Sequence, residues 1–326
     1  MLLAVAAIVV GLVVLVWSSD RFVEGASALA FHLGVSRLVI GLTVVGFGTS
    51  APEMLVSGLA AWQGNPALGV GNAIGSNIAN IALILGLTAL FYPLGVHSRI
   101  VRFELPLLLG VTAFGGLLLY NGYLSRLDGV LLLAGLVAVM GLLVWDALRA
   151  KAQDALAVEL KTEVETGLPM RQAVLWFVIG LVLLLVSARM LVWGAVEVAE
   201  ALGVSDLVIG LTIVAVGTSL PELAASIAGA RKGESDLVIG NVIGSNMFNL
   251  LGVMALPGLI APARLPADAL GRDFPLMAVL TLVLMVMTFS FRSGPRCINR
   301  LEGALLTIAF VGYQMFLLSS VDGMGG

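Results

Sequence analysis

Two stretches of this sequence are nearly identical: VIGLTVVGFGTSAPE at 39–53 and VIGLTIVAVGTSLPE at 208–222. A second matched pair follows them, GNAIGSN at 71–77 and GNVIGSN at 240–246. The offset is 169 residues throughout, and it holds without a gap from Gly34 to Asn80. The chain therefore contains an internal duplication, and the rest of the sequence is interpreted around it.

The composition around the duplication is that of a membrane protein. Hydrophobic residues make up 60% of the 326 residues, and charged residues make up 11%, about half the share of an ordinary soluble domain. The mean hydropathy of +1.08 leaves no polar shell for a soluble core of this size. We predict an all-α integral membrane protein, because helices satisfy their own backbone hydrogen bonds in lipid.

Apolar stretches long enough to span a bilayer recur along the chain. A spanning helix needs about 20 apolar residues. The apolar N-terminus has no preceding Lys or Arg and no clear cleavage site, so we interpret it as the first such helix rather than as a secretory signal. We predict ten transmembrane helices, at about 2–20, 38–61, 67–91, 103–121, 127–147, 172–192, 206–229, 236–260, 274–290 and 302–320.

The longest polar stretch divides the chain into two halves. It covers 149–171 and is too short for a folded domain, so we predict a partly helical linker between five-helix repeats at 1–148 and 172–326. Five is odd, so the second repeat should enter the membrane from the opposite side. Inverted repeats of this kind are common in secondary transporters, which bind substrate near the membrane midplane where the repeats meet.

Basic residues predict the orientation of the helices. With both termini outside, the outside loops hold few basic residues: Arg126, Arg264 and Arg272. The inside loops then hold many: Arg37, Arg99, Arg102, Arg149, Lys151, Lys161, Arg171, Arg231, Lys232, Arg292, Arg296 and Arg300. This bias predicts a multi-pass protein of the cell (inner) membrane with a cytoplasmic linker and both termini outside.

Glu53 and Glu222 lie well inside the second and seventh predicted helices. A charge near the membrane centre costs ~2.5–3.5 kcal/mol on insertion scales. No Lys or Arg lies at neighbouring mid-helix positions, so a bound cation is the simplest compensation. Ser-x-x-Glu followed by a helix is also a capping box, and a purely structural capping role remains an alternative.

The residues before each glutamate predict broken helices 2 and 7. Pro52 and Pro221 lack a backbone donor and disturb the preceding turn. Such a break should free carbonyl oxygens near Gly46 and Ala215. Hydroxyl oxygens are present as well, on Thr49, Ser50, Thr218 and Ser219. Carboxylate, carbonyl and hydroxyl oxygens are the ligands of hard cations.

The helices that follow each break carry further polar residues. Ser76 and Asn80 are four residues apart and share one helix face, as do Ser245 and Asn249. We interpret these four residues as lining the ion site. The alternative is interhelical hydrogen bonding, which is typical of Ser and Asn in membrane helices.

Together these motifs resemble the α-repeats of the cation/calcium antiporter superfamily, and most of all its prokaryotic sodium/calcium exchangers. The resemblance covers GTSxPE at 48–53 and 217–222 and GSNxxN at 75–80 and 244–249. It implies that helices 2, 3, 7 and 8 form a compact core, across which helices 1 and 6 slide to alternate access.

The resemblance also implies a set of ligands. Glu53 and Glu222 would be the central ligands. The flanking ligands would be the side chains of Thr49, Ser50, Ser76, Thr218, Ser219, Ser245, Asn80 and Asn249 and the backbone near Gly46 and Ala215. Potassium-dependent relatives have Asp at the position of Asn249, so the resemblance argues against potassium dependence.

The expected function is Na⁺/Ca²⁺ antiport. One Ca²⁺ or two Na⁺ neutralise two carboxylates, so competition for overlapping oxygens is enough to enforce exchange. A proton-driven antiporter, or one for another divalent ion, remains the alternative, since buried glutamates can carry protons. A passive channel fits broken helices in inverted repeats less well.

Other functions are disfavoured by the sequence. No His lies inside a predicted helix to act as a base, so we do not expect an enzyme. The single cysteine, Cys297, excludes an internal disulfide. We expect no cofactor, since Na⁺ and Ca²⁺ are cargo, and no nucleic-acid or obligatory protein partner beyond the lipid bilayer.

Overall fold

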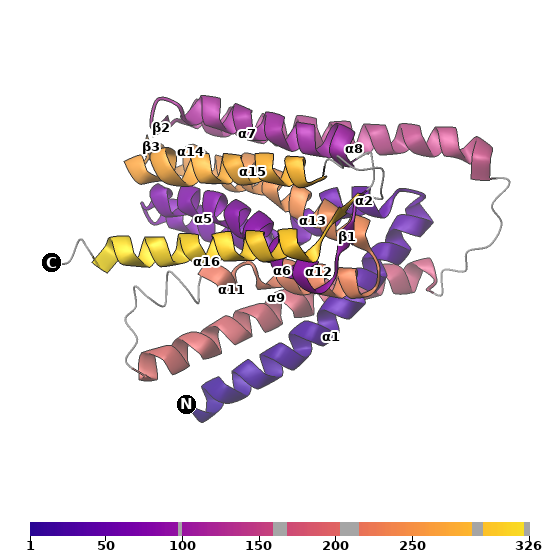
Figure 1. Ribbon diagram of the computed structural model, residues 1–326, viewed down its shortest axis with the longest axis horizontal. Helices are drawn as coiled ribbons and strands as arrows, with labels where there is room; N and C mark the ends of the chain where they lie inside the picture. Colours follow the sequence, from indigo (N-terminus) through magenta and orange to yellow (C-terminus); the bar gives the residue numbers. More distant parts are fainter. Residues whose placement is uncertain (97–99, 159–167, 203–214, 289–295, 323–326) are drawn as a thin grey trace.

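The computed structural model describes residues 1–96, 100–158, 168–202, 215–288 and 296–322. Across these residues the chain is helical apart from two small two-stranded sheets (Figure 1). The first-half elements are α1 (Leu2–Leu33), α2 (Arg37–Ile40), η1 (Gly41–Val45), α3 (Gly46–Thr49), α4 (Ala51–Trp62), α5 (Pro66–Ile78), η2 (Ala79–Leu85), α6 (Gly86–Phe91), β1 (Leu94–Gly95), η3 (Ile100–Glu104), α7 (Leu105–Leu119), β2 (Tyr123–Leu124) and α8 (Arg126–Val158). The second-half elements are α9 (Met170–Ala201), α11 (Ala215–Gly217), α12 (Leu220–Arg231), α13 (Ser235–Phe248), η5 (Asn249–Val253), α14 (Ala255–Ile260), β3 (Ala263–Arg264), η6 (Ala269–Asp273), α15 (Phe274–Thr288), β4 (Cys297–Ile298) and α16 (Arg300–Asp322). The η segments are π-helical turns within longer helices.

Within the described residues, eight helices are long and apolar enough to span a membrane. They become nine if Arg37–Thr49 and Ala51–Trp62, which meet at an angle of 42°, form one span. The predicted break in the second helix is therefore present. Of the predicted seventh helix at 206–229, the part before Ala215 lies outside the described residues.

Three helices, α1, α8 and α9, are longer than predicted. α1 runs to Leu33 and α9 to Ala201, which is 13 and 9 residues beyond the predicted ends at 20 and 192. The charged residues that suggested an end are accommodated on the helix surface, as in the Arg21–Glu24 ion pair. α8 also continues to Val158, so the predicted linker is helical over its first residues.

Local signals explain where several helices begin and end. The Ser36 hydroxyl accepts a hydrogen bond from Val39 N–H and caps α2. Asn65 caps α5 in the same way, with Pro66 at the first helical position. Gly34 ends α1 with φ of 63°, a left-handed conformation that glycine adopts without strain.

The duplication is visible in the element bounds. α4 and α12, α6 and α14, β1 and β3, η3 and η6, and α7 and α15 begin and end at positions that differ by 169 residues. The gapless relation therefore extends in the structure to Leu119 and Thr288, well beyond the sequence motif.

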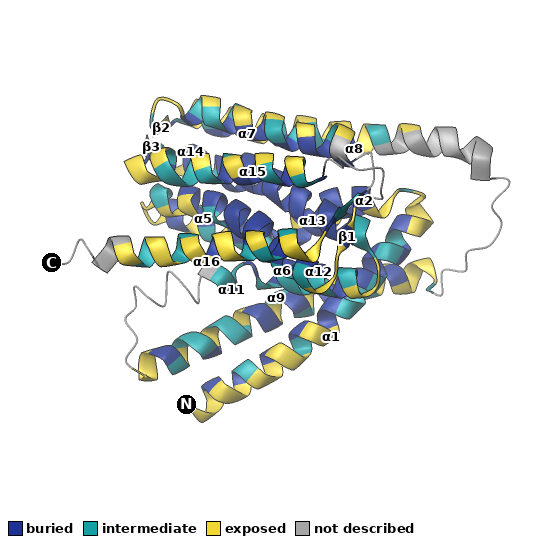
Figure 2. Cartoon of the chain, in the orientation of Figure 1, coloured by how far each residue is buried: buried dark blue, intermediate teal, exposed yellow. Residues whose placement is uncertain are grey.

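The centre of the molecule is built from two helices of matching position. They run through Pro66–Phe91 and Ser235–Ile260, and their most apolar 18-residue windows are 72% and 100% buried. Figure 2 shows this dark, buried centre between exposed outer helices. The large apolar cluster around it contains Ile74, Ile81, Ile243 and Leu251.

α1 and α9 form a separate antiparallel pair along one side of this core (Figure 1). Glycines set the close approach of the two helices. A Cβ atom on Gly25 would lie 2.4 Å from Phe177 N, and one on Gly194 would lie 2.7 Å from Ala4 O. Gly25 and Gly194 also differ by 169 positions.

Short antiparallel sheets join loops at both ends of the core. β1 pairs with β4 at one end, and β2 pairs with β3 at the other. The N-terminus and the C-terminal end of α16 lie at the β2–β3 end, whereas α8 ends and α9 begins at the opposite end (Figure 1). The sequence indicated only loops there, since two-residue strands leave no pattern.

Candidate cation site

The first broken helix places Glu53 at the start of a half-helix. Ser50 leaves the α-helical region, with φ of −81° and ψ of 0°, between α3 and α4. Pro52 and Glu53 occupy the first turn of α4, and Glu53 is 1% exposed. The helix N-terminus carries a partial positive charge, which favours a carboxylate there.

The second half repeats this arrangement. Ser219, with φ of −91° and ψ of 4°, separates α11 from α12. Pro221 and Glu222 occupy the first turn of α12, and Glu222 is also 1% exposed. Each break therefore presents one buried carboxyl group.

Close packing of the first broken helix on α13 brings the two halves together. A Cβ atom on Gly244 would lie 2.3 Å from Leu42 O, so only glycine fits this approach. The Thr49 hydroxyl consequently reaches the other repeat. It donates to Asn241 Oδ1 at 3.1 Å and lies 3.4 Å from Ser245 Oγ.

The two glutamates lie within electrostatic range of each other at this junction. The Thr49 side chain, which contacts Asn241 and Ser245, lies close to the Glu222 carboxyl group. Among the described residues, the buried charged side chains are all acidic: no Lys, Arg or His is buried. In this part of the chain no buried basic side chain balances the pair, as the sequence predicted.

Several buried oxygen atoms of the predicted ligand residues have no hydrogen-bond partner among the described residues. They are Ser50 Oγ, Glu53 Oε2, Ser219 Oγ, Glu222 Oε2 and Asn249 Oδ1. Buried polar atoms are rarely left unpaired, so each one needs an explanation. A hard cation, which takes six to eight oxygen ligands in the case of Ca²⁺, would satisfy them together.

The asparagines of the two central helices include structural residues and candidate site residues. Asn80 Nδ2 donates to Asn246 Oδ1 at 3.0 Å, and Asn77 Nδ2 donates to Asn246 O at 3.2 Å. These bonds connect the two central helices. Asn80 and Asn249 both lie at π-helical turns, η2 and η5, which are frequent at functional sites.

The remaining predicted site residues are described by their burial and their backbone contacts. Ser76 is 5% exposed and Ser245 is fully buried, while Thr218 is partly buried after α11. Gly46 O accepts the Ser50 N–H at 3.1 Å, which closes the last turn of α3 before the break at Ser50. Ala215 is the first described residue of α11.

Sequence reasoning did not assign two further polar pairs. Asn72 Nδ2 donates to Glu53 O at 3.1 Å and to Ser57 Oγ at 3.0 Å, which supports the first turn of α4. Asn241 contacts Thr49, and Ser226 is buried on α12. The available signal was the duplication itself, because Asn72 matches Asn241 and Ser57 matches Ser226 at the same offset of 169.

A small cavity reaches the junction from α9. It has a volume of about 60 Å³ and is lined by Pro52, Thr218 and Pro221 from the two breaks and by Arg189 from α9. No cluster of three or more His, Cys, Asp or Glu residues occurs in the part of the chain that the structure describes. The donor set is therefore oxygen-based, with two carboxylates and neutral groups.

Comparison with known proteins identifies the family of this chain. The chain is 50% identical over 321 residues to the putative antiporter CaxA of Alkalimonas amylolytica, covering 98% of this chain and 100% of that protein. It is 31% identical to the sodium/calcium exchanger MaX1 of Methanosarcina acetivorans, covering 95% and 97%. A solved structure of the sodium–calcium exchanger NCX_Mj, soaked with zero Na⁺ and Ca²⁺, superimposes with a TM-score of 0.82 at 34% identity, covering 97% and 99%. The family model described as sodium/calcium exchanger protein matches residues 3–145 and 172–319. This chain belongs to the sodium/calcium exchanger family, whose members are membrane transporters.

Proposed function

We propose that the protein is a secondary active antiporter that exchanges Na⁺ for Ca²⁺ by alternating access, with Glu53 and Glu222 as the central cation ligands. One observation carries the proposal. Two buried carboxyl groups from different repeats lie within electrostatic range of each other, each has an oxygen without a hydrogen-bond partner, and no basic side chain is buried among the described residues. Family membership makes a transported cation the natural partner of these groups.

The charge of the site makes the exchange obligatory. Two ionised carboxylates carry −2, which one Ca²⁺ or two Na⁺ neutralise. The further ligands in this proposal are the side chains of Thr49, Ser50, Ser76, Asn80, Thr218, Ser219, Ser245 and Asn249 and the carbonyls of Gly46 and Ala215. Because Ca²⁺ and Na⁺ use overlapping oxygens, they exclude each other, and an empty site would leave uncompensated charge in the membrane.

The architecture in this proposal is ten helices in two inverted five-helix repeats, 1–148 and 172–326, joined by a linker at 149–171. The matched element bounds support the repeats. The antiparallel packing of α1 on α9 supports the inversion, because these helices are equivalent. So do the two sheets, in which the equivalent strands β1 and β3 pair at opposite ends of the molecule.

The proposed location is the cell (inner) membrane, with both termini outside and the linker cytoplasmic. The excess of basic residues in the predicted inside loops supports this orientation. A 44%-identical relative is the inner membrane protein YrbG of Escherichia coli, covering 97% of both chains. Access would alternate as the α1–α9 pair slides along the core.

Vesicle flux measurements test the proposal. Proteoliposomes loaded with Na⁺ should take up Ca²⁺ when diluted into Na⁺-free medium, and Glu53→Gln and Glu222→Gln should each abolish the uptake. K⁺-loaded vesicles serve as the control. Uptake that follows a pH gradient without Na⁺ would instead assign the coupling to protons, and full uptake by both variants would refute the ligand assignment.

A further inference from the structure

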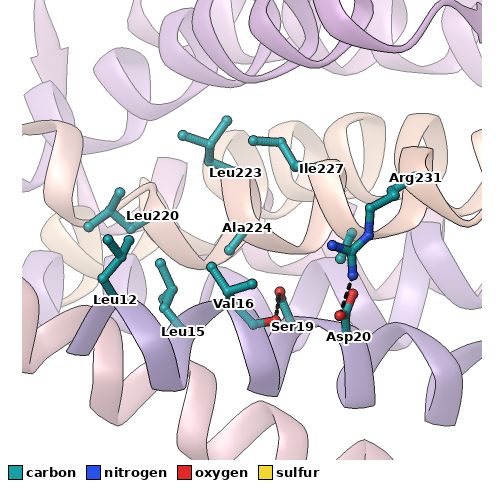
Figure 3. Close-up of a pocket in the computed structure, with 11 residues that line it drawn as sticks. Leu12, Leu15, Val16, Ser19, Asp20, Leu220, Leu223, Ala224, Ile227 and Arg231 are labelled. Atoms are coloured by element: carbon teal, nitrogen blue, oxygen red, sulfur yellow. Dashed lines mark hydrogen bonds and ion pairs between the residues drawn. The ribbon is translucent and has the colours of Figure 1, made fainter. Parts of the chain in front are cut away.

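A groove between α1 and α12 lies apart from the cation site and has a distinct chemistry (Figure 3). Its volume is about 230 Å³. Leu12 and Val16 from α1 face Leu223 and Ile227 from α12, with Ala224 at the floor, so most of its wall is aliphatic. A groove of this size is too small for a whole drug-sized ligand but suits part of an extended chain.

One end of the groove is charged. Arg231 forms an ion pair with Asp20 Oδ2, and Lys232 Nζ donates to Asp20 O at 2.6 Å. Figure 3 shows Arg231 reaching from the end of α12 to Asp20 on α1. The nearby charges Arg21 and Glu24 pair with each other.

The charged end lies at the depth of a membrane surface. At 1.5 Å per residue, Asp20 is about 27 Å along α1 from Leu2, close to the thickness of the hydrocarbon core, roughly 30 Å. The aliphatic section from Leu12 to Val16 then lies within the hydrocarbon. The groove thus has the polarity profile of a lipid, with a polar end at the interface and an apolar end in the membrane.

The polar end of the groove has both an unpartnered hydrogen-bond acceptor and unused hydrogen-bond donors. Asp20 Oδ1 is buried without a hydrogen-bond partner among the described residues. A guanidinium group has five N–H donors and an ammonium group has three, whereas Asp20 takes one donor from Arg231 and one from Lys232. A matching ligand head therefore needs an anion for the basic residues and a donor for Asp20.

We propose that this groove binds one phospholipid whose head group carries a primary ammonium, such as phosphatidylethanolamine. The phosphate would accept from Arg231 and Lys232, the ammonium would donate to Asp20 Oδ1, and one acyl chain would lie along the aliphatic wall. Choline has no N–H to donate, and glycerol has no positive charge. The assignment does not depend on which ion drives transport.

The other repeat supplies an internal comparison. The position equivalent to Asp20 is Arg189, which lines the cavity of about 60 Å³ beside the two broken helices. No Asp or Glu is among the described residues that line it. The lipid site is therefore a feature of one repeat, and Arg189→Gln is a matched control for loss of a groove cation.

Native mass spectrometry of the full chain in detergent tests the proposal. The protein is incubated with equal amounts of phosphatidylethanolamine, phosphatidylcholine and phosphatidylglycerol of the same acyl chains. We expect one phosphatidylethanolamine to bind at least tenfold more tightly than the other two. The double variant Arg231→Gln/Lys232→Gln should lose this binding, while Arg189→Gln should keep it.

Two further variants separate the head-group and chain contacts. Asp20→Asn should abolish the preference for ethanolamine over choline, and Ala224→Phe should block binding with the head-group residues intact. Thermal unfolding of each variant in detergent identifies any that fail to fold. Equal binding of all three lipids by the native protein, or unchanged binding after Ala224→Phe, would overturn the proposal.

Discussion

The two central helices and the α1–α9 pair meet their surroundings in opposite ways. The pair is the more apolar of the two regions, yet its most apolar windows are only 33% and 28% buried, against 72% and 100% for the central helices. In a soluble protein the more apolar helices would be inside. Here lipid takes the apolar surface, and the interior is reserved for polar groups that need protein partners.

The contrast extends to how each region is held. The central helices are connected by hydrogen bonds from the Asn77 and Asn80 side-chain amides to Asn246, and the strand that follows each central helix pairs with a strand of another loop. α1 and α9 contact each other through glycines, aliphatic side chains and the Phe22–Phe177 ring pair, in a second apolar cluster that also includes Ala225 and Leu237 of the adjoining helices. This difference suits a fixed polar core and a pair that slides along it.

Removing a core charge is the strongest test of this contrast. Glu222→Gln should lower Na⁺-dependent Ca²⁺ uptake in proteoliposomes at least a hundredfold, because it halves the negative charge available to Ca²⁺. The thermal unfolding temperature of this variant in ion-free buffer should not fall. The substitution removes a buried carboxylate that has no compensating partner, and such a charge destabilises the folded protein.

The variant to compare with Glu222→Gln lies in the α1–α9 pair. Glu24→Gln removes a carboxylate of α1 that is 36% exposed and bound to Arg21. It should leave uptake within about twofold of the native rate, because exposed ion pairs contribute little. Comparable losses in both variants would mean that acidic residues act through the overall charge rather than as ligands.

Glycine substitutions compare the packing of the two regions. Gly244→Ala places a Cβ 2.3 Å from Leu42 O, so the first broken helix must move away from α13. We expect it to cost about 1–3 kcal/mol or more of stability and to abolish uptake. Gly25→Ala, whose Cβ would lie 2.4 Å from Phe177 N, should slow uptake but leave the half-saturating Ca²⁺ concentration unchanged.

Gly312→Ala on α16 controls for the substitution itself, since nothing lies within 4 Å of the added carbon. Unfolding temperatures and uptake rates are measured for all three variants. A Gly25→Ala protein with weakened Ca²⁺ affinity would show that the α1–α9 pair shapes the site, contrary to the division drawn above.

A hydroxyl exchange probes the core more finely. The Thr49 hydroxyl contacts Asn241 and Ser245 from the other repeat, whereas Thr43 on the same broken helix donates only to its own Val39 carbonyl. Thr49→Val should raise the half-saturating Na⁺ concentration about five- to tenfold, near 1 kcal/mol. Thr43→Val should change it little, and equal effects would remove Thr49 from the site.

The duplication made much of this predictable. The repeat-equivalent Gly-Thr-Ser-x-Pro-Glu motifs predicted two broken helices, and the described breaks at Ser50 and Ser219 lie within these motifs. The polar character of both residues at membrane depth implied a shared interior. The shared interior could be predicted because a charged side chain facing lipid at that depth would be too costly.

Other features depend on contacts that no local pattern records. The approach of Gly244 to Leu42 O sets Thr49 against Asn241, but the sequence of either segment is equally compatible with a looser crossing. The role of Asn72 in holding Glu53 O is hidden for the same reason. The predicted helix ends were wrong where a helix continues through charged residues, as α1 does through Arg21.

The native cysteine offers the smallest and most specific test of a fixed core and a moving pair. Cys297 lies in β4, whose pairing with β1 joins two loops at one end of the core. Burial, together with the nearby Glu302 carboxylate, raises the pKa of the Cys297 thiol. Less thiolate is then present at pH 7 than for a free cysteine, so maleimide should label it slowly, and faster as the pH rises.

The labelling rate of Cys297 should be the same in Na⁺ and in Ca²⁺, because the sheet does not move with the pair. A cysteine in α1, Leu12→Cys in a Cys297→Ser background, faces the groove against α12 and should change its rate between the two ions. In oriented vesicles, membrane-impermeant maleimide should reach Cys297 only from the cytoplasmic side. Ion-dependent labelling of Cys297 with a constant rate at position 12 would reverse the assignment of which region moves.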